Sequence, residues 1–165
     1  MSGLPVRRWG GCLRSFRSKT TKGVTVAEFQ NIVYCTDFSE NADKAFSKAS
    51  AIAALTGGNL YILHVVPEAV GERERNREIW YANDVERAKE IMTQTCVAPL
   101  GVQAESEVRY GKEPVEILGF AEEKGADLIV MGGRGMGALT RLLGGGSVAE
   151  KVVKNAKIPV LVVPF

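Results

Sequence analysis

Five short runs of apolar and β-branched residues recur along the chain from residue 31 onward. Each run is about as long as a single strand of a globular protein. The runs that predict strands are Ile32–Thr36, Leu60–Val66, Gln103–Arg109, Asp127–Met131 and Pro159–Val163.

The segments between these runs carry apolar residues at helical spacing. In residues 40–56, Ala42, Ala45 and Ala49 lie three or four positions apart, which places them on one helix face. Further helices are predicted over about 74–97, from a first turn around Pro114, and over about 147–156. The strict alternation of strand and helix predicts an α/β fold: an open, doubly wound, five-stranded parallel sheet with helices on both faces.

Charge divides the chain into two unequal parts. Residues 1–29 hold six basic side chains against Glu28 alone, whereas residues 30–165 hold 15 basic and 18 acidic side chains. The first part has no apolar period and predicts a basic, disordered leader, for which an organellar presequence is the functional alternative. The second part predicts a single domain, without the basic surface that nucleic-acid binding requires.

Cysteine content and hydropathy restrict the environment of the protein. The three cysteines are odd in number and show no paired spacing, which disfavours a secreted disulfide framework and favours a reducing compartment. The longest apolar stretch, Ile158–Phe165, is far shorter than the roughly 20 residues of a membrane-spanning helix. We therefore expect a cytoplasmic protein with no membrane partner.

Two segments at the ends of strands carry the candidate chemistry. In an open parallel sheet the ligand crevice lies beyond the carboxyl ends of the strands, where the strand order reverses. Cys35–Ser39, which includes Thr36 and Asp37, lies at the end of the first predicted strand, and Gly132–Gly137 follows the fourth. Asp37 also suits a helix N-cap, but its place beside the crevice favours a binding role.

A glycine-rich segment before the last predicted helix indicates an anion site. Seven residues between Gly132 and Gly146 are glycine, and glycine lets backbone N–H groups approach a phosphate closely. Ser147 and Glu150 match a capping box, so Ser147 is expected to cap the helix and, in addition, to contact phosphate. The segment fits neither the dinucleotide fingerprint, which should follow the first strand, nor a P-loop, which needs a lysine before the hydroxyl.

These motifs together resemble the universal stress protein family. The resemblance runs from about Phe29 to Val163. It rests on Asn31–Ser39, Leu63–Val66, Gly111-x-x-Pro114, Ala126–Gly132, and Gly132-x-x-Gly135 with a later glycine-serine pair. It implies the strand order 3-2-1-4-5 and a homodimer joined through the last strand. In the ATP-binding branch of the family, the aspartate and the backbone after the histidine hold the adenosine end, while the glycine motif holds ribose and phosphates.

The resemblance carries these ATP contacts onto seven positions of this sequence. The matching positions are Asp37, Val65, Gly132, Gly135, Gly146, Ser147 and Val148. Thr36, next to Asp37, and Arg134, a cation among the first glycines, complete the candidate set; a solvated loop arginine is the alternative for Arg134.

The loop between the glycines and the last helix departs from the family pattern. The stretch from Met136 to Gly145 is one residue longer than the pattern requires. Either the three glycines Gly144–Gly146 absorb the extra residue, or the loop shifts and the phosphates lose a donor. We expect ATP binding to be retained.

These expectations give one preferred function and two alternatives. The preferred function is an ATP-binding regulatory stress-response protein, with Mg²⁺ or Mn²⁺ on the phosphates. We do not expect an enzyme, because no general base or arginine finger accompanies the glycines. The alternatives are a nucleotide-free dimeric scaffold of the same fold and a slow ATPase. His64, the single histidine, has no cluster of metal ligands or nucleophile around it in the sequence and is interpreted as structural.

Overall fold

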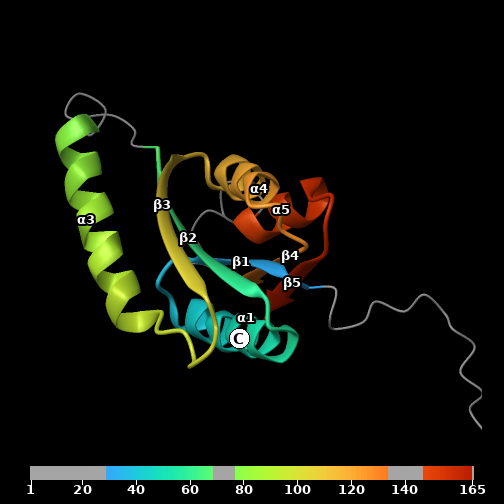
Figure 1. The fold of residues 1–165 in the computed structure, drawn as a ribbon. Helices are drawn as coiled ribbons and strands as arrows, with labels where there is room; N and C mark the ends of the chain where they lie inside the picture. The colour runs from blue at the N-terminus through green and yellow to red at the C-terminus, as the bar shows by residue number, and fades with distance from the viewer. Residues whose placement is uncertain (1–28, 69–76, 134–146, 165) are drawn as a thin grey trace, which may run out of the picture.

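The computed structural model describes residues 29–68, 77–133 and 147–164. Its strands form one parallel sheet in the order β3-β2-β1-β4-β5 (Figure 1). The strands are β1 (Asn31–Thr36), β2 (Asn59–Pro67), β3 (Ala104–Gly111), β4 (Leu128–Gly132) and β5 (Val160–Val163). The predicted fold class and strand order are confirmed.

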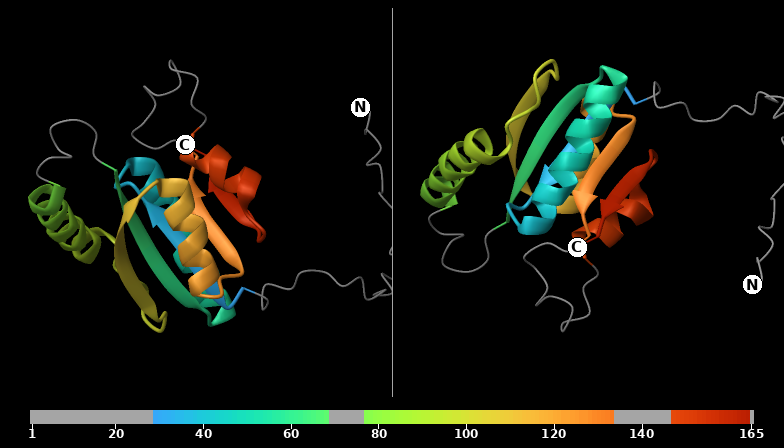
Figure 2. Two further views of the ribbon diagram at one scale, coloured as in Figure 1. Left: turned by 90° about the horizontal axis from the view of Figure 1, so that it is seen from above. Right: turned by 90° about the horizontal axis from the view of Figure 1, so that it is seen from below.

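Helices cover both faces of the sheet. The helices of the described ranges are α1 (Glu40–Thr56), α3 (Arg77–Thr95), α4 (Glu113–Glu123) and α5 (Val148–Asn155). Side chains of α1 and α3 pack against one face, and side chains of α4 and α5 pack against the other. Figure 2 shows α1 and α4 on opposite sides of the sheet. Within the described ranges, no helix combines the length and the apolar character needed to cross a bilayer.

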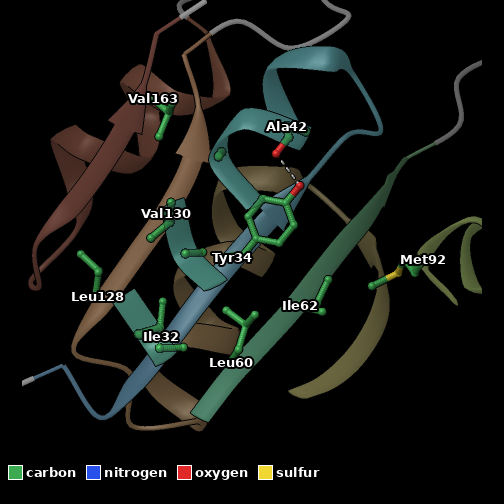
Figure 3. Close-up of a cluster of buried hydrophobic side chains, with 12 residues drawn as sticks. Ile32, Tyr34, Ala42, Leu60, Ile62, Met92, Leu128, Val130 and Val163 are labelled. Carbon is green, nitrogen blue, oxygen red and sulfur yellow. Dashed lines mark hydrogen bonds between the residues drawn. The ribbon is translucent and has the colours of Figure 1, made fainter. Parts of the chain in front are cut away.

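The core on the α1 face combines large strand residues with small helix residues. Ile32 and Tyr34 of β1 are fully buried there, against alanines of α1 that include Ala42 and Ala45. The Tyr34 hydroxyl donates a hydrogen bond of 2.8 Å to the Ala42 carbonyl, so its polar atom is satisfied inside the core (Figure 3). Burial raises the pKa of the Tyr34 phenol. The first turn of α1 is thereby tied to the middle of β1.

The core on the α4 and α5 face is formed by the alternate residues of the same strands. Val33 and Leu63 pack there with Phe120 of α4 and Val152 of α5. Cys35 belongs to this cluster, and burial raises the pKa of its thiol to about 12. In this environment Cys35 acts as a small buried hydrophobic residue.

The observed elements differ from the predicted ones mainly at their ends. β4 begins at Leu128, one residue later than predicted, and the carboxylate of Asp127 just before it accepts hydrogen bonds from the backbone N–H groups of Gln30 and Asn31. β5 is covered unevenly. Val163 is buried, whereas Leu161 on the same face is 37% exposed, so the expectation that both faces are covered holds only at the carboxyl end of this strand.

Candidate functional site

The strand order reverses between β1 and β4, and this reversal defines the candidate site. β1 pairs with β2 on one side and with β4 on the other, with Thr36 opposite His64 and Cys35 opposite Met131. The chain leaves β1 for α1 on one face, and the helix that follows β4, α5, lies on the other (Figure 2). The carboxyl ends of β1, β2 and β4 therefore meet at one edge of the sheet, which is the position expected for a ligand site.

The connection between β1 and α1, residues 37–39, is held by its own side chains. The buried Thr36 Oγ1 accepts a hydrogen bond of 3.0 Å from the Phe38 N–H. One carboxylate oxygen of Asp37 accepts from the Ser39 N–H at 3.1 Å and from the Ser39 hydroxyl at 2.6 Å. Two successive side-chain turns of this kind fix the direction in which the chain enters α1.

The helix cap differs from the alternative considered for Asp37. Ser39 is the N-cap of α1, and its oxygen accepts from the Ala42 N–H at 3.3 Å. Aspartate and serine are comparable N-cap residues, so the sequence alone does not choose between them. Because α1 begins at Glu40, Asp37 lies too early to cap the helix and instead positions the serine that does.

Phe38 and His64 form a contact that joins the ends of β1 and β2. Phe38 has φ +61°, in the left-handed region that bulky residues rarely adopt. Its ring stacks on the His64 imidazole, with 4.3 Å between ring centroids and 28° between ring planes. His64 Nδ1 lies 2.9 Å from the Thr36 carbonyl oxygen, and since a carbonyl only accepts, Nδ1 carries the proton.

The electrostatic environment of His64 favours the neutral ring. Burial lowers its pKa, against the opposing effects of the Thr36 carbonyl and the carboxylates of Asp37 and Asp84. Sequence reasoning assigned no site role to Phe38 or Ser39. The one signal for His64 in the sequence was a polar residue within the predicted apolar run Leu60–Val66.

The end of β4 shows why glycine stands at position 132. A β-carbon on Gly132 would lie 3.2 Å from the backbone carbonyl atoms of Asn41, so glycine allows the first turn of α1 to approach this strand. The Gly133 N–H donates to the Val163 carbonyl at 2.8 Å, which continues the pairing of β4 with β5. Gly132 thus has a packing role in addition to the role expected from its motif.

The remaining candidate residues lie on β2 and at the start of α5. Val65 is buried in β2, next to His64. The Ser147 oxygen accepts from the Glu150 N–H at 3.1 Å, so the predicted capping function of Ser147 is confirmed. Val148 is the first residue of α5 and packs against the core of the α4 and α5 face. Arg134, Gly135 and Gly146 lie outside the described residues.

This arrangement offers two kinds of interaction at one edge of the sheet. The start of α5 presents the positive end of a helix dipole, together with backbone N–H groups and a serine, which suits an anion. The ends of β1 and β2 offer carboxylate and carbonyl oxygens, which suit the hydroxyl and amino groups of a nucleoside.

The comparisons with known proteins agree on one family. The model of the universal stress protein family matches residues 28–164. The universal stress protein MJ0531 of Methanocaldococcus jannaschii is 37% identical over 142 residues, which cover 82% of each chain.

Solved structures give the same result. The structure of hypothetical protein MJ0577 aligns with a TM-score of 0.67 and 31% identity, covering 83% of this chain and 96% of that one. A universal stress protein in complex with cAMP aligns with a TM-score of 0.57 and 27% identity, covering 82% of this chain and 97% of that one. The universal stress protein from Archaeoglobus fulgidus in complex with dAMP aligns with a TM-score of 0.55 and 25% identity, covering 82% of this chain and 98% of that one. The chain described here belongs to the universal stress protein family.

Proposed function

We propose that this chain is an ATP-binding regulatory protein of the stress response. The observation that carries the proposal is the strand reversal between β1 and β4, with α5 following β4 on the other face under a serine cap. Two structural relatives are complexes with adenine nucleotides, cAMP and dAMP, which supports the same ligand class here. ATP is the specific member of that class that we propose.

The proposed contacts divide between the two ends of the nucleotide. Asp37 and the backbone of Val65 hold the adenosine end, with Thr36 fixing the connection in which Asp37 lies. The ribose and phosphates are assigned to the glycine motif and the start of α5. These residues are Gly132, Arg134, Gly135, Gly146, Ser147 and Val148.

A divalent ion would be bound through the nucleotide. Mg²⁺ keeps several waters and is commonly held by substrate phosphates with one or two carboxylates. Among the described residues, no group of three or more His, Cys, Asp and Glu side chains is arranged to hold a metal. Asp37 supplies a carboxylate near the proposed site, which fits an ion whose other ligands are phosphate oxygens and water.

The outer edge of β5 favours a second candidate function, that of a dimeric scaffold. β5 is the last strand of the sheet, and its Leu161 side chain is 37% exposed. An apolar edge strand pairs readily with another chain, and a two-fold contact between identical edges closes without forming fibres. We propose a homodimer through Val160–Val163, in both the nucleotide-binding and the nucleotide-free candidate.

The free thiols of Cys35 and Cys96 support the cytoplasm as the compartment that we propose for this protein.

Thermal melting with ATP, ADP and AMP distinguishes these candidates. A ligand that binds only the folded state raises the melting temperature by mass action, so ATP at about 100 times its Kd adds about 2.7 kcal/mol to the free energy of unfolding. Replacement of Gly135 by valine should abolish the shift, because a bulky side chain blocks close approach of the backbone. A folded Gly135→Val variant that binds ATP as tightly as the parent would show that the site is misplaced. No shift for the parent would favour the scaffold, and sustained phosphate release would favour a slow ATPase.

A further inference from the structure

The Phe38–His64 contact is not explained by the packing of the core alone. Phe38 is the one non-glycine residue with positive φ among the described residues, and nothing in its side chain favours that conformation. A bulky residue stays in the left-handed region only when its surroundings hold it there, and such strain gathers at functional sites. Phe38 packs against the core of the α1 face, its N–H donates to the Thr36 hydroxyl, and its ring stacks on the His64 ring.

His64 makes both contacts from a different strand. Its Nδ1–H donates to the Thr36 carbonyl at 2.9 Å, and its ring face meets the Phe38 ring at 4.3 Å between centroids. One side chain of β2 therefore fixes the residues on both sides of Asp37. Asp37 in turn accepts two hydrogen bonds from Ser39, so its carboxylate is held in one orientation.

We infer that His64 is a positioning residue for the proposed nucleotide site: it fixes residues 37–39, and through them the Asp37 carboxylate, without touching the ligand. The inference deepens the proposed function and rests on it. Because Val65 follows His64 directly, the same side chain also sets the spacing between the two segments assigned to the adenosine end.

Substitutions can separate the two contacts of His64 with the 37–39 connection, the hydrogen bond from Nδ1 and the stacking of the ring. Asparagine at position 64 retains an N–H donor close to the place of Nδ1, whereas leucine retains apolar bulk without a donor. Asparagine at position 38 tolerates positive φ but removes the ring. Ile62→Val, two residues earlier on β2 and opposite Tyr34, removes a buried methylene without changing the His64 contacts and controls for a general loss of stability.

Titration calorimetry of these variants with ATP and AMP tests the inference. We expect His64→Leu to weaken both ligands by the same factor, about threefold to tenfold, the range for one lost hydrogen bond. His64→Asn keeps the donor but loses the ring contact, so it should recover part of the affinity that His64→Leu loses. Phe38→Asn should weaken both ligands, and Ile62→Val should bind as the parent does. Equal affinity of His64→Leu and the parent, equal weakness of His64→Asn and His64→Leu, or an equal loss in Ile62→Val would each overturn the inference.

A measurement without ligand separates this inference from the proposed function. In amide hydrogen exchange, His64→Leu should speed exchange at Phe38 and Ser39 by at least about tenfold relative to Tyr34, and His64→Asn, which keeps the donor, should speed it less. If the parent bound no adenine nucleotide, the proposed function would fail, but the exchange rates would still test whether His64 fixes residues 37–39. Unchanged exchange at Phe38 and Ser39 in a folded His64→Leu variant would overturn the positioning role by itself.

Discussion

His64 is the single histidine of the chain, and its environment makes a pH dependence predictable. Burial lowers its pKa in the folded protein below the ordinary 6.5, so the unfolded chain binds a proton more readily. The free energy of unfolding should therefore fall as the pH drops below about 6.5, by at most about 1.4 kcal/mol per pH unit from this one group.

Denaturant unfolding between pH 7.5 and 5.5 measures this contribution. The His64→Asn variant lacks the titrating ring and should lose less stability than the parent over the same interval. Parallel pH profiles for the two proteins would show that the His64 pKa is the same in the folded and unfolded states.

Gly132 provides a second test at the level of a single residue. A β-carbon there would press on the Asn41 carbonyl at 3.2 Å, so Gly132→Ala should lower the free energy of unfolding by about 1–2 kcal/mol. The matched control is Gly119→Ala in α4, where a β-carbon meets nothing within 4 Å and a gain of about 0.5–1 kcal/mol is expected. A Gly132→Ala protein as stable as the parent would mean that α1 does not approach β4 this closely.

Individual residue roles were predictable from sequence only where a local rule has one solution. Ser147 with Glu150 has one reading as a cap, and the structure confirms it. Asp37 and Ser39 are both good caps two positions apart, and only the start of α1 decides between them. The packing role of Gly132 depends on Asn41, which lies far away in the sequence, so no local pattern could reveal it.

At the scale of elements, β5 offers the clearest prediction. The carbonyls of Pro159 and Val163 accept hydrogen bonds from β4, so the backbone groups of Val162 point to the open edge. Val162→Pro removes an outward N–H without breaking a bond to β4, and should leave the subunit folded but monomeric in light scattering at micromolar concentration.

The control for this variant is Val162→Ala, which keeps the N–H and loses a comparable part of the packing. It should remain a dimer. A monomer for the unmodified protein would rule the dimer model out, and a dimer unaffected by Val162→Pro would place the interface elsewhere.

Element types were predictable because apolar period and turn residues agree along the described chain. The residues at which the elements begin and end were not predictable, because contacts with residues far away in the sequence decide them. Asp127 was included in the predicted fourth strand, but it lies just before β4, where its carboxylate accepts hydrogen bonds from the N–H groups of Gln30 and Asn31. The apolar residues around Leu161 in the sequence predict that it is buried, but its position on an edge strand leaves it partly exposed.

At the scale of the whole molecule, the family match begins at residue 28, and among the residues that the structure describes Gln30 already donates a hydrogen bond to Asp127. We therefore propose that residues 30–165 form the domain and that residues 1–25 can be removed. The shortened chain should melt within about 3 °C of the full chain, a shift that corresponds to about 1 kcal/mol. Calorimetry of both chains checks this, and an insoluble or markedly less stable product would assign the leader a structural role.

The fold was predictable as a whole because alternating strands and helices in this order leave few ways to bury both faces of a sheet. The placement of the candidate residues on the fold was predictable in part, and their contacts with a nucleotide stay a prediction. Thr36, Asp37, Val65, Gly132, Ser147 and Val148 lie on the elements expected for them, at the ends of β1, β2 and β4 and the start of α5. The His64 contacts were not predictable, because they depend on the register between β1 and β2.

The location of the nucleotide is the central claim, and amide chemical shifts in the isotope-labelled full chain test it most directly. On titration with ATP, the largest shifts should fall at Asp37, Val65, Gly132, Ser147 and Val148, at the carboxyl edge of the sheet. The amides of Asn31, Asn59 and Leu128, at the opposite ends of the strands, should stay unchanged. Shifts gathered at that opposite edge, or no shifts at saturating ATP, would contradict the proposed site.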